Sequence, residues 1–250
     1  MACVPDEENR IPLICIRQVT VAYPSVIALY NINLDIYSGE LIGLLGPNGS
    51  GKTTLLKTIL GTIRPINGKI HLYGEKSAHN GIPRHLLHKI GYVPQQHTID
   101  RNFPALVKDV VMMGRYGRIG FLYSPTTKDH QAVKEALELV GMDEFAHRPI
   151  GHLSGGQQQK VLIARALAQK PEIMLLDEPT AALDYRMKKS IIELLKGLNE
   201  QGLTILTIHH DIDLLRKYCS RIALLNRQII WTGAPTSPDL DSIMERVFRR

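Results

Sequence analysis

The segment from Gly46 to Thr53 has residue types and a spacing suited to holding phosphate groups. It reads Gly-Pro-Asn-Gly-Ser-Gly-Lys-Thr and fits the Walker A pattern G-x-x-x-x-G-K-S/T. Glycines let main-chain N–H groups close around an anion, because no side chain obstructs them. Lys52 should reach the β- and γ-phosphates of ATP, and the Thr53 hydroxyl should bind Mg²⁺. The predicted ATP contacts here are Gly46, Pro47, Asn48, Gly49, Ser50, Gly51, Lys52, Thr53 and Thr54.

Two adjacent carboxylates could complete such a site. Asp177 comes directly after an apolar run of strand length, and Glu178 follows it. A carboxylate at the carboxyl end of a buried parallel strand can hold Mg²⁺ through water. Glu178 is then placed to accept a proton from an attacking water molecule. An acidic turn after a strand is common by itself, so this interpretation depends on the phosphate loop upstream.

A second glycine-rich segment, Leu153 to Gln157, precedes a predicted helix over residues 157–169. Ser154 with Gly155 and Gly156 would form a second anion cradle at the amino end of that helix. One nucleotide does not need two phosphate cradles in one chain. The two cradles therefore need not serve the same nucleotide.

Elements with the pattern of a parallel sheet must position these residues. Short apolar runs over residues 41–45, 173–176 and 204–208 each end at a polar or glycine-rich turn, as buried parallel strands do. Helical periodicity lies between them, with apolar faces over residues 132–140 and 191–198. Strands that alternate with helices predict an α/β fold with a parallel sheet.

Two stretches depart from that alternation. Apolar and polar residues alternate within residues 14–36, which predicts a half-exposed antiparallel sheet. Residues 98–169 lack strand signals and predict a helical insertion between two sheet strands. Arg246, Arg249 and Arg250 form a local basic cluster, which we interpret as a solvated chain end.

The stretch from Leu153 to Gln157 resembles the signature motif of ABC-transporter ATPases, and it stands at the expected place before the Asp177 strand. Other positions of that family are also filled. Tyr23 matches the aromatic residue that stacks on adenine. Gln95 matches the glutamine that contacts Mg²⁺ and water and senses the membrane partner.

Two further matches lie after the Asp177 strand. Asp184, in Ala181-Ala-Leu-Asp184, matches the loop exchanged across the dimer. His210, directly before Asp211, matches the switch histidine that contacts the γ-phosphate, although His209 stands beside it. The resemblance covers residues 14–233, and Lys160 departs from it where arginine is commoner.

The resemblance implies a fold and a domain organisation. The fold class is α/β, with a phosphate-loop NTPase (RecA-like) core, an N-terminal antiparallel β subdomain and an inserted α-helical subdomain. We expect one domain over residues 1–250. The core with the β subdomain covers about 12–96 and 170–235, the helical subdomain with the signature about 97–169, and a C-terminal tail 236–250.

The resemblance also implies a mechanism in which two copies pair head to tail. Ser154, Gly155, Gly156 and Gln157 of one copy would cap the ATP on the phosphate loop of the other. Thr53, Gln95 and Asp177 would hold Mg²⁺. Glu178, His210, Gln95 and Lys52 would carry catalysis, with Asp184 at the dimer interface.

Composition is consistent with a globular protein. The chain has 250 residues, 44% of them hydrophobic, and a mean hydropathy of −0.07. No apolar stretch reaches the roughly 18–20 residues of a membrane-spanning helix. The three cysteines are scattered without a C-x-x-C pair, which indicates reduced thiols. A net charge of +6 does not choose among nucleic acid, lipid and nucleotide. The polar, acidic start predicts no signal peptide and a cytoplasmic protein.

Several segments are similar to the ATPases of zinc, manganese and iron uptake systems, notably residues 103–116 and 140–156. This similarity implies a separate membrane permease, a solute-binding protein outside the membrane, no nucleic-acid partner, and a place on the inner face of the membrane. Siderophore and cobalamin importers share much of the pattern and remain alternatives. An iron–sulfur assembly ATPase is a further alternative.

Two smaller hypotheses concern other residues. Apolar side chains within residues 103–122 could form a groove for a short helix of the permease, although most of them suit the core of the helical insertion. His85 and His88, with His79 nearby, have a spacing that could hold zinc, but a third ligand and its supporting groups are not evident.

Overall fold

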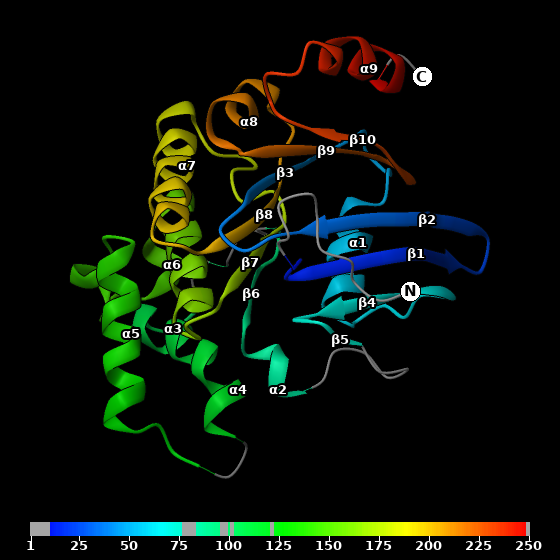
Figure 1. Ribbon diagram of the computed structural model, residues 1–250. Coiled ribbons are helices and arrows are strands. Elements are labelled where there is room, and N and C mark those ends of the chain that lie inside the picture. The colour runs from blue at the N-terminus through cyan, green and yellow to red at the C-terminus, as the bar shows by residue number, and fades with distance from the viewer. Residues whose placement is uncertain (1–10, 77–83, 96–99, 101–102, 121–122, 249–250) are drawn as a thin grey trace. The chain divides into compact units, whose positions relative to one another are not determined.

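The structure, a computed structural model, describes residues 11–76, 84–95, 100, 103–120 and 123–248 (Figure 1). The chain divides into two compact units. Unit 1 holds residues 1–87 and 199–250, and unit 2 holds residues 88–198. Unit 2 therefore contains the predicted helical insertion together with the strands on both sides of it. Unit 2 thus extends beyond the predicted helical subdomain, about 97–169, at both ends.

The first sheet of unit 1 is antiparallel, as predicted. Its strands β1 (Ile14–Tyr23), β2 (Val26–Ile36), β4 (Asn67–Leu72) and β5 (Glu75–Lys76) lie in the order β2-β1-β4-β5. The expectation of half-exposure is wrong for the start of β1, because Ile14, Cys15 and Ile16 are all buried. Successive side chains point to opposite faces of a strand, so both faces of this inner strand are covered here.

The second sheet of unit 1 is mixed and carries the phosphate loop. Its strands are β3 (Leu41–Leu45), β8 (Thr204–Ile208), β9 (Arg221–Asn226) and β10 (Gln228–Gly233), in the order β10-β9-β3-β8. Strand β3 runs parallel to β8 and β9, and β10 pairs antiparallel with β9. The bounds of β3 and β8 coincide with the predicted runs, since every residue of these strands is buried.

Unit 1 also contains three short helices: α1 (Lys52–Ile59), α2 (Arg84–Leu87) and α8 (Ile212–Tyr218). Helix α1 buries Leu55, Leu56 and Ile59, which lie on one face. Gly61 follows with a φ of +73°, a left-handed conformation that terminates a helix at little cost only in glycine.

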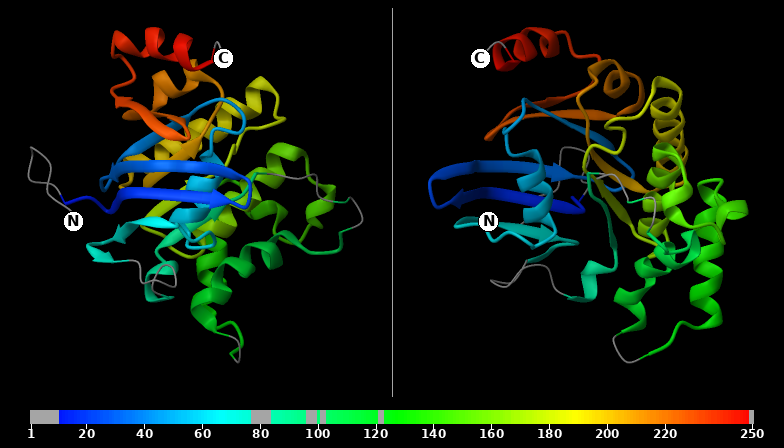
Figure 2. Two further views of the ribbon diagram at one scale, coloured as in Figure 1. Left: turned by 90° about the vertical axis from the view of Figure 1, so that its right-hand side faces the viewer. Right: turned by 180° about the vertical axis from the view of Figure 1, so that it is seen from behind.

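The C-terminal segment is a helix rather than an irregular tail. Helix α9 (Asp239–Phe248) lies beside α8 and β10 (Figures 1 and 2). Its residues Leu240 and Val247 are buried in a cluster with Leu45, Leu215, Ile222 and Leu224. Spacing of seven residues places Leu240 and Val247 on one helix face, and that face completes the core under β3 and β9. Arg246 is exposed, as expected of the basic end.

Unit 2 combines two parallel strands with most of the helices. Strand β6 (Ile90–Val93) pairs in parallel with β7 (Ile173–Leu176). The helical elements are α3 (Val107–Met112), η1 (Met113–Arg115), α4 (Tyr116–Ile119), α5 (Thr127–Leu139), η2 (Asp143–Phe145), η3 (Ile150–His152), α6 (Gly155–Leu167) and α7 (Tyr185–Glu200). Helices α3, α5 and α6 pack on one another, so the predicted helical insertion is confirmed.

The predicted apolar faces of these helices are buried. Helix α5 buries Ala132, Val133, Ala136 and Leu137, and α7 buries Ile191, Ile192, Leu195 and Leu198. Among the helices that the structure describes, none combines the length and the apolarity needed to span a bilayer.

The buried face of α9 gives a stability prediction. We expect Leu240→Ala to lower the free energy of unfolding by about 2–5 kcal/mol, because it leaves a cavity in the cluster around Leu45. Ile230→Ala, at a side chain that is 44% exposed on β10, is the control and should change the free energy much less. Urea unfolding measures both. Equal effects of the two substitutions would show that α9 is not part of the core.

Candidate nucleotide site

The phosphate loop joins β3 to α1 and encloses a buried cation. Lys52 is the first residue of α1 and only 6% exposed. Its Nζ donates hydrogen bonds to the carbonyl oxygens of Gly46 at 2.8 Å and Pro47 at 3.0 Å. The loop therefore wraps around the ammonium group, which is the arrangement expected of a lysine that serves bound phosphates.

Two of the loop glycines have no room for a side chain. A Cβ on Gly46 would stand 2.1 Å from the carbonyl oxygen of Leu225 in β9. Gly51 has a φ of +100°, and a Cβ on it would stand 2.7 Å from the carbonyl oxygen of Ala28 in β2. Main-chain atoms cannot move aside as a flexible side chain can. The loop is thus held between the backbones of β9 and β2.

The remaining loop residues fit the phosphates of a nucleotide. The Ser50 hydroxyl is buried and has no hydrogen-bond partner among the described residues, so it can donate to an anion. Asn48 and Gly49 are exposed, and Thr53 and Thr54 are half-buried on the first turn of α1. The helix directs its positive end toward the loop. A phosphate group would accept a hydrogen bond from Ser50 and would interact favourably with the Lys52 ammonium.

Unit 1 also holds Tyr23 and His210. Tyr23 ends β1 and is 48% exposed, so its ring is available to a ligand. His210 follows β8 and is exposed, whereas the neighbouring His209 is buried and its Nδ1 accepts a hydrogen bond from the Asp211 N–H at 3.4 Å. The Asp211 carboxylate caps α8. This difference in exposure favours His210 over His209 as the residue that meets a nucleotide.

The acidic pair lies in unit 2, at the end of β7. Asp177 is buried, and its N–H donates to the Val93 carbonyl of β6. Burial, followed by the Asp177 charge, raises the pKa of Tyr92. Glu178 adopts a left-handed φ of +50°, and its Oε2 accepts a hydrogen bond from Gln95 Nε2 at 2.9 Å. The structure therefore joins two residues that the sequence assigned to the same reaction.

The signature segment forms the amino end of α6. Ser154 is the N-cap, its Oγ accepts from the Gln157 N–H at 3.4 Å, and Gln157 Oε1 accepts from the Ser154 N–H at 3.0 Å. Ser154 and Gly155 are exposed. A pocket of about 410 Å³ opens here, lined by Gly151, His152, Leu153 and Ser154. The helix thus begins two residues earlier than predicted, because the capping box satisfies its first N–H groups.

Met187 packs against the signature segment, and this contact was not predicted from the sequence. A Cβ on Gly156 would stand 2.0 Å from Met187 Cε, so the methionine packs on this glycine. Asp184 Oδ1 accepts a hydrogen bond from the Met187 N–H at 2.9 Å and so caps α7. Asp184 therefore fixes the chain that packs against the cradle. A lone methionine in a helical pattern gives no signal of this contact.

The predicted site residues divide between the two units. Unit 1 carries the phosphate loop, Tyr23 and His210, and unit 2 carries Gln95, Asp177, Glu178, the signature segment and Asp184. Within unit 2, direct contacts join Gln95 to Glu178, and Asp184 through Met187 to Gly156.

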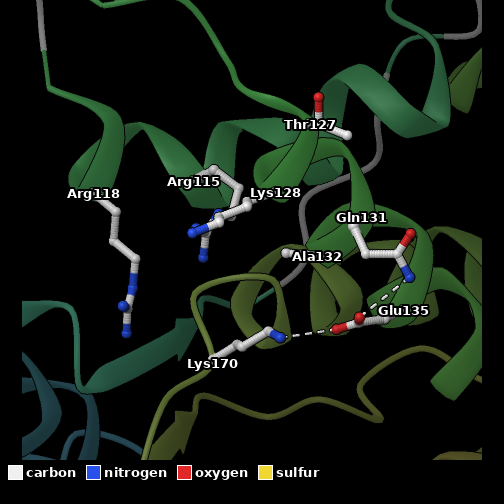
Figure 3. Close-up of a pocket in the computed structure, with 8 residues that line it drawn as sticks. All are labelled: Arg115, Arg118, Thr127, Lys128, Gln131, Ala132, Glu135 and Lys170. Atoms are coloured by element: carbon white, nitrogen blue, oxygen red, sulfur yellow. Dashed lines mark hydrogen bonds and ion pairs between the residues drawn. The ribbon is translucent and has the colours of Figure 1, made fainter.

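A second pocket of unit 2, of about 510 Å³, is lined by Arg115, Arg118, Thr127, Lys128, Gln131, Ala132, Glu135 and Lys170 (Figure 3). Arg115 binds Asp129 Oδ1 through Nε at 2.9 Å and Nη2 at 2.8 Å, and its Nη1 donates to the Ala168 carbonyl. Lys170 binds Glu135 at 2.9 Å. These pairs fasten η1 and the residues after α6 to α5, so they stabilise the helices that carry the signature.

The structure describes only part of the residues on which the two smaller hypotheses depend. Val107, Val110 and Met112 are buried in the helical core, whereas Phe103, Met113 and Tyr116 are exposed. Phe121, Leu122, His79 and the side chain of His85 lie outside the described residues. Within the part of the chain that the structure describes, no three His, Cys, Asp or Glu side chains are grouped to hold a metal ion.

An α/β fold with a lysine-centred phosphate loop and a separate signature helix defines the class of ATP-binding cassettes. Residues 29–181 match the family model described as "ABC transporter". The manganese transport system ATP-binding protein MntB of Bacillus subtilis is 45% identical over 86% of this chain and 84% of its own length. Relatives named for zinc and for chelated iron transport are 36% and 40% identical.

Solved structures agree with this result. An inward-facing ABC transporter described as being of the metal-chelate type has a TM-score of 0.83, with 32% identity over 95% of this chain and 89% of that chain. A dimeric structure of MJ0796, a bacterial ABC transporter cassette, has a TM-score of 0.75, with 31% identity over 90% and 99% of the two chains. This chain belongs to the ABC transporter family. It is an ATP-binding protein with ATPase activity.

The close approach of Gly46 to β9 predicts the effect of a single methyl group. We expect Gly46→Ala to abolish ATP binding, because the new Cβ would displace either the loop or the Leu225 carbonyl. Gly39→Ala is the control, since Gly39 also has a positive φ of +76° but has open space around it. It should cost about 1–2 kcal/mol of stability and leave ATP affinity unchanged. Calorimetric titration with MgATP would refute this account if both variants bound equally well.

Asp129 predicts an acid dependence of stability. Hydrogen bonds from the Thr126 side chain and main chain, and then from Arg115, lower the pKa of this carboxyl from 3.8 to about 2. The charged form therefore stabilises the fold above pH 3.8, and the contribution is lost as the pH falls toward 2. We expect Asp129→Asn to flatten the fall in melting temperature across this range. Glu138→Gln, on the exposed side of α5, is the control. An unchanged pH profile in Asp129→Asn would contradict the assignment.

Proposed function

We propose that two copies of this chain pair head to tail and hydrolyse two ATP molecules at sites shared between them. The phosphate loop of one copy holds each ATP, and Ser154, Gly155, Gly156 and Gln157 of the other copy complete the site. The observation that carries this proposal is the presence of two separate anion cradles in one chain. One surrounds Lys52 and the other is the exposed amino end of α6. The dimeric relative MJ0796 supports the pairing.

The chemistry follows from the residues in each cradle. Lys52 and the loop N–H groups neutralise the phosphates, Tyr23 stacks on adenine, and His210 stabilises charge on the γ-phosphate. Asp184 lies at the interface between the copies, next to Tyr185, which is 76% exposed. Thr53, Gln95 and Asp177 would hold Mg²⁺, which neutralises phosphate charge when bound.

Glu178 is the general base of this proposal. The Gln95 amide donates a hydrogen bond to its carboxylate, which fixes the orientation of the group that would accept a proton from water. Its left-handed backbone is uncommon for a residue with a side chain, and such strain concentrates at functional sites. The hydrogen bond from Gln95 would connect the base to the membrane partner, which the family resemblance implies that Gln95 senses.

The transported solute is a divalent metal ion, with manganese, zinc and iron as candidates. The names of the similar proteins support this class of solute. A membrane permease supplies the pathway, a solute-binding protein outside the membrane delivers the ion, and this chain lies on the cytoplasmic face against the permease. Exposed Met113 and Tyr116 offer apolar surface for the permease.

Uptake of a chelated metal is the second candidate. It is favoured by the similarity to a transporter of the metal-chelate type and to a protein named for chelated iron transport. Both candidates require the same ATPase reaction, because the permease and the binding protein select the solute. Uptake of radiolabelled manganese, zinc or ferric chelate by cells that lack this chain would separate them.

The proposed role of Glu178 predicts that Glu178→Gln keeps ATP binding and loses hydrolysis by about 100-fold or more. The neutral amide can still exchange a hydrogen bond with Gln95, but it cannot take a proton from water. The variant should also accumulate as an ATP-bound dimer. Glu193→Gln, at an exposed carboxylate of α7, is the matched control. Phosphate release and size-exclusion chromatography with MgATP measure both properties, and wild-type turnover in Glu178→Gln would exclude this residue as the base.

A further inference from the structure

The turn between β9 and β10 contacts the phosphate loop through its main chain. Asn226 of β9 and Gln228 of β10 pair directly, so Arg227 alone makes the turn. The Arg227 N–H donates to the Ser50 carbonyl at 2.8 Å, and the Arg227 carbonyl accepts from the Tyr30 N–H at 2.7 Å. One residue therefore connects the phosphate loop to β2.

The backbone of Arg227 is in an unfavourable conformation. Its φ is +58°, in the left-handed region where a Cβ is crowded by the following carbonyl. The Arg227 side chain is exposed, so its burial contributes no stability that would offset this strain. Strain of this kind persists where the surrounding structure requires it, and here the two main-chain hydrogen bonds require it.

The hydrogen bond to Ser50 sets the direction of the next amide. A trans peptide is planar, so the Gly51 N–H points opposite to the Ser50 carbonyl. Because the carbonyl points at the β9–β10 turn, the Gly51 N–H points away from the turn. An N–H group of the phosphate loop is thereby aimed by a residue more than 170 positions later in the chain.

The strand residues beside the turn pack against the phosphate loop and a buried core. Leu225, two residues before Arg227, touches Gly46 through its carbonyl oxygen. Leu224 belongs to the buried cluster that contains Leu45 and the α9 residues, and Trp231 of β10 packs against that cluster. The two strands that hold the turn are therefore anchored on the same core as the base of the phosphate loop.

We propose that Arg227 is a positioning residue for ATP, acting through its main chain. Its N–H fixes the Ser50 peptide, its carbonyl ties that peptide to β2, and the loop is held in the form that receives phosphates before ATP arrives. The inference rests on ATP binding by the loop and not on pairing of two copies or on a permease. Pre-formed donors bind an anion better than donors that must be ordered on binding.

Substitutions at Arg227 separate the main chain from the side chain. Arg227→Gly keeps the N–H and relieves the left-handed strain, and Arg227→Ala keeps the N–H and removes the guanidinium. Arg227→Pro removes the N–H and, because the proline ring holds φ at about −65°, also excludes the left-handed turn. We expect the Gly and Ala variants to bind MgATP within about twofold of wild type. The Pro variant should bind at least about tenfold more weakly, because it loses both the hydrogen bond to Ser50 and the turn that positions it. Equilibrium binding to the single chain measures this.

Two results would overturn the proposal. One is wild-type affinity in a folded Arg227→Pro chain. The other is an equal loss of affinity in all three variants, which would assign the effect to the guanidinium. Because proline can disturb the hairpin, hydrogen exchange of the Arg227 amide in the wild-type chain is measured as well. We expect slow exchange that MgATP slows further, and an amide that exchanges as fast as an exposed one would also refute the hydrogen bond.

Discussion

The structure depends on one buried positive charge. Lys52 is buried, and its ammonium group donates hydrogen bonds to the carbonyl oxygens of Gly46 and Pro47. Burial of an ammonium group is expensive unless oxygen atoms or an anion surround it. The anionic phosphates of ATP suit such an ammonium group better than neutral acceptors do. The buried Ser50 hydroxyl, which has no hydrogen-bond partner among the described residues, also suits a phosphate group as its acceptor. The buried ammonium and the buried hydroxyl together give the loop two donors that suit a phosphate group.

Much of unit 1 serves to keep that lysine and its loop in place. Gly46 and Gly51 abut carbonyl oxygens of β9 and β2, and Arg227 fastens these two strands to the loop. Helix α9 closes the core beneath β3 and β9. In unit 2 the same logic applies to the signature helix, whose amino end is capped by Ser154 and whose far end is held by Arg115. Each cradle is thus built on rigid elements, as preorganised binding requires.

The sequence predicted the strands β3, β7 and β8 to the residue, because a short continuous apolar run that ends in a turn fits a buried strand better than a helix. It also indicated the two glycine-rich segments and the Asp177–Glu178 pair as candidate site residues, because these motifs are local. It did not predict α9, whose apolar residues are few and find their partners far away in the chain. Arg227 and Met187 were missed for a related reason. Their contacts with the phosphate loop and the signature segment form only in the folded chain, and neither residue type indicates such a role in a sequence.

The shared site is the central claim, and mixing two inactive variants tests it most directly. Lys52→Ala disables the phosphate loop, and Gly155→Asp places a negative charge in the exposed signature cradle, where a carboxylate suits the helix end and spares the fold. In a mixed pair, one site carries both changes and the other carries neither. ATP hydrolysis should therefore be near zero for each variant alone and return to about a quarter of the wild-type rate in an equal mixture, as random pairing of symmetric copies requires. An equal mixture that remains as inactive as its components would contradict a site built from two chains.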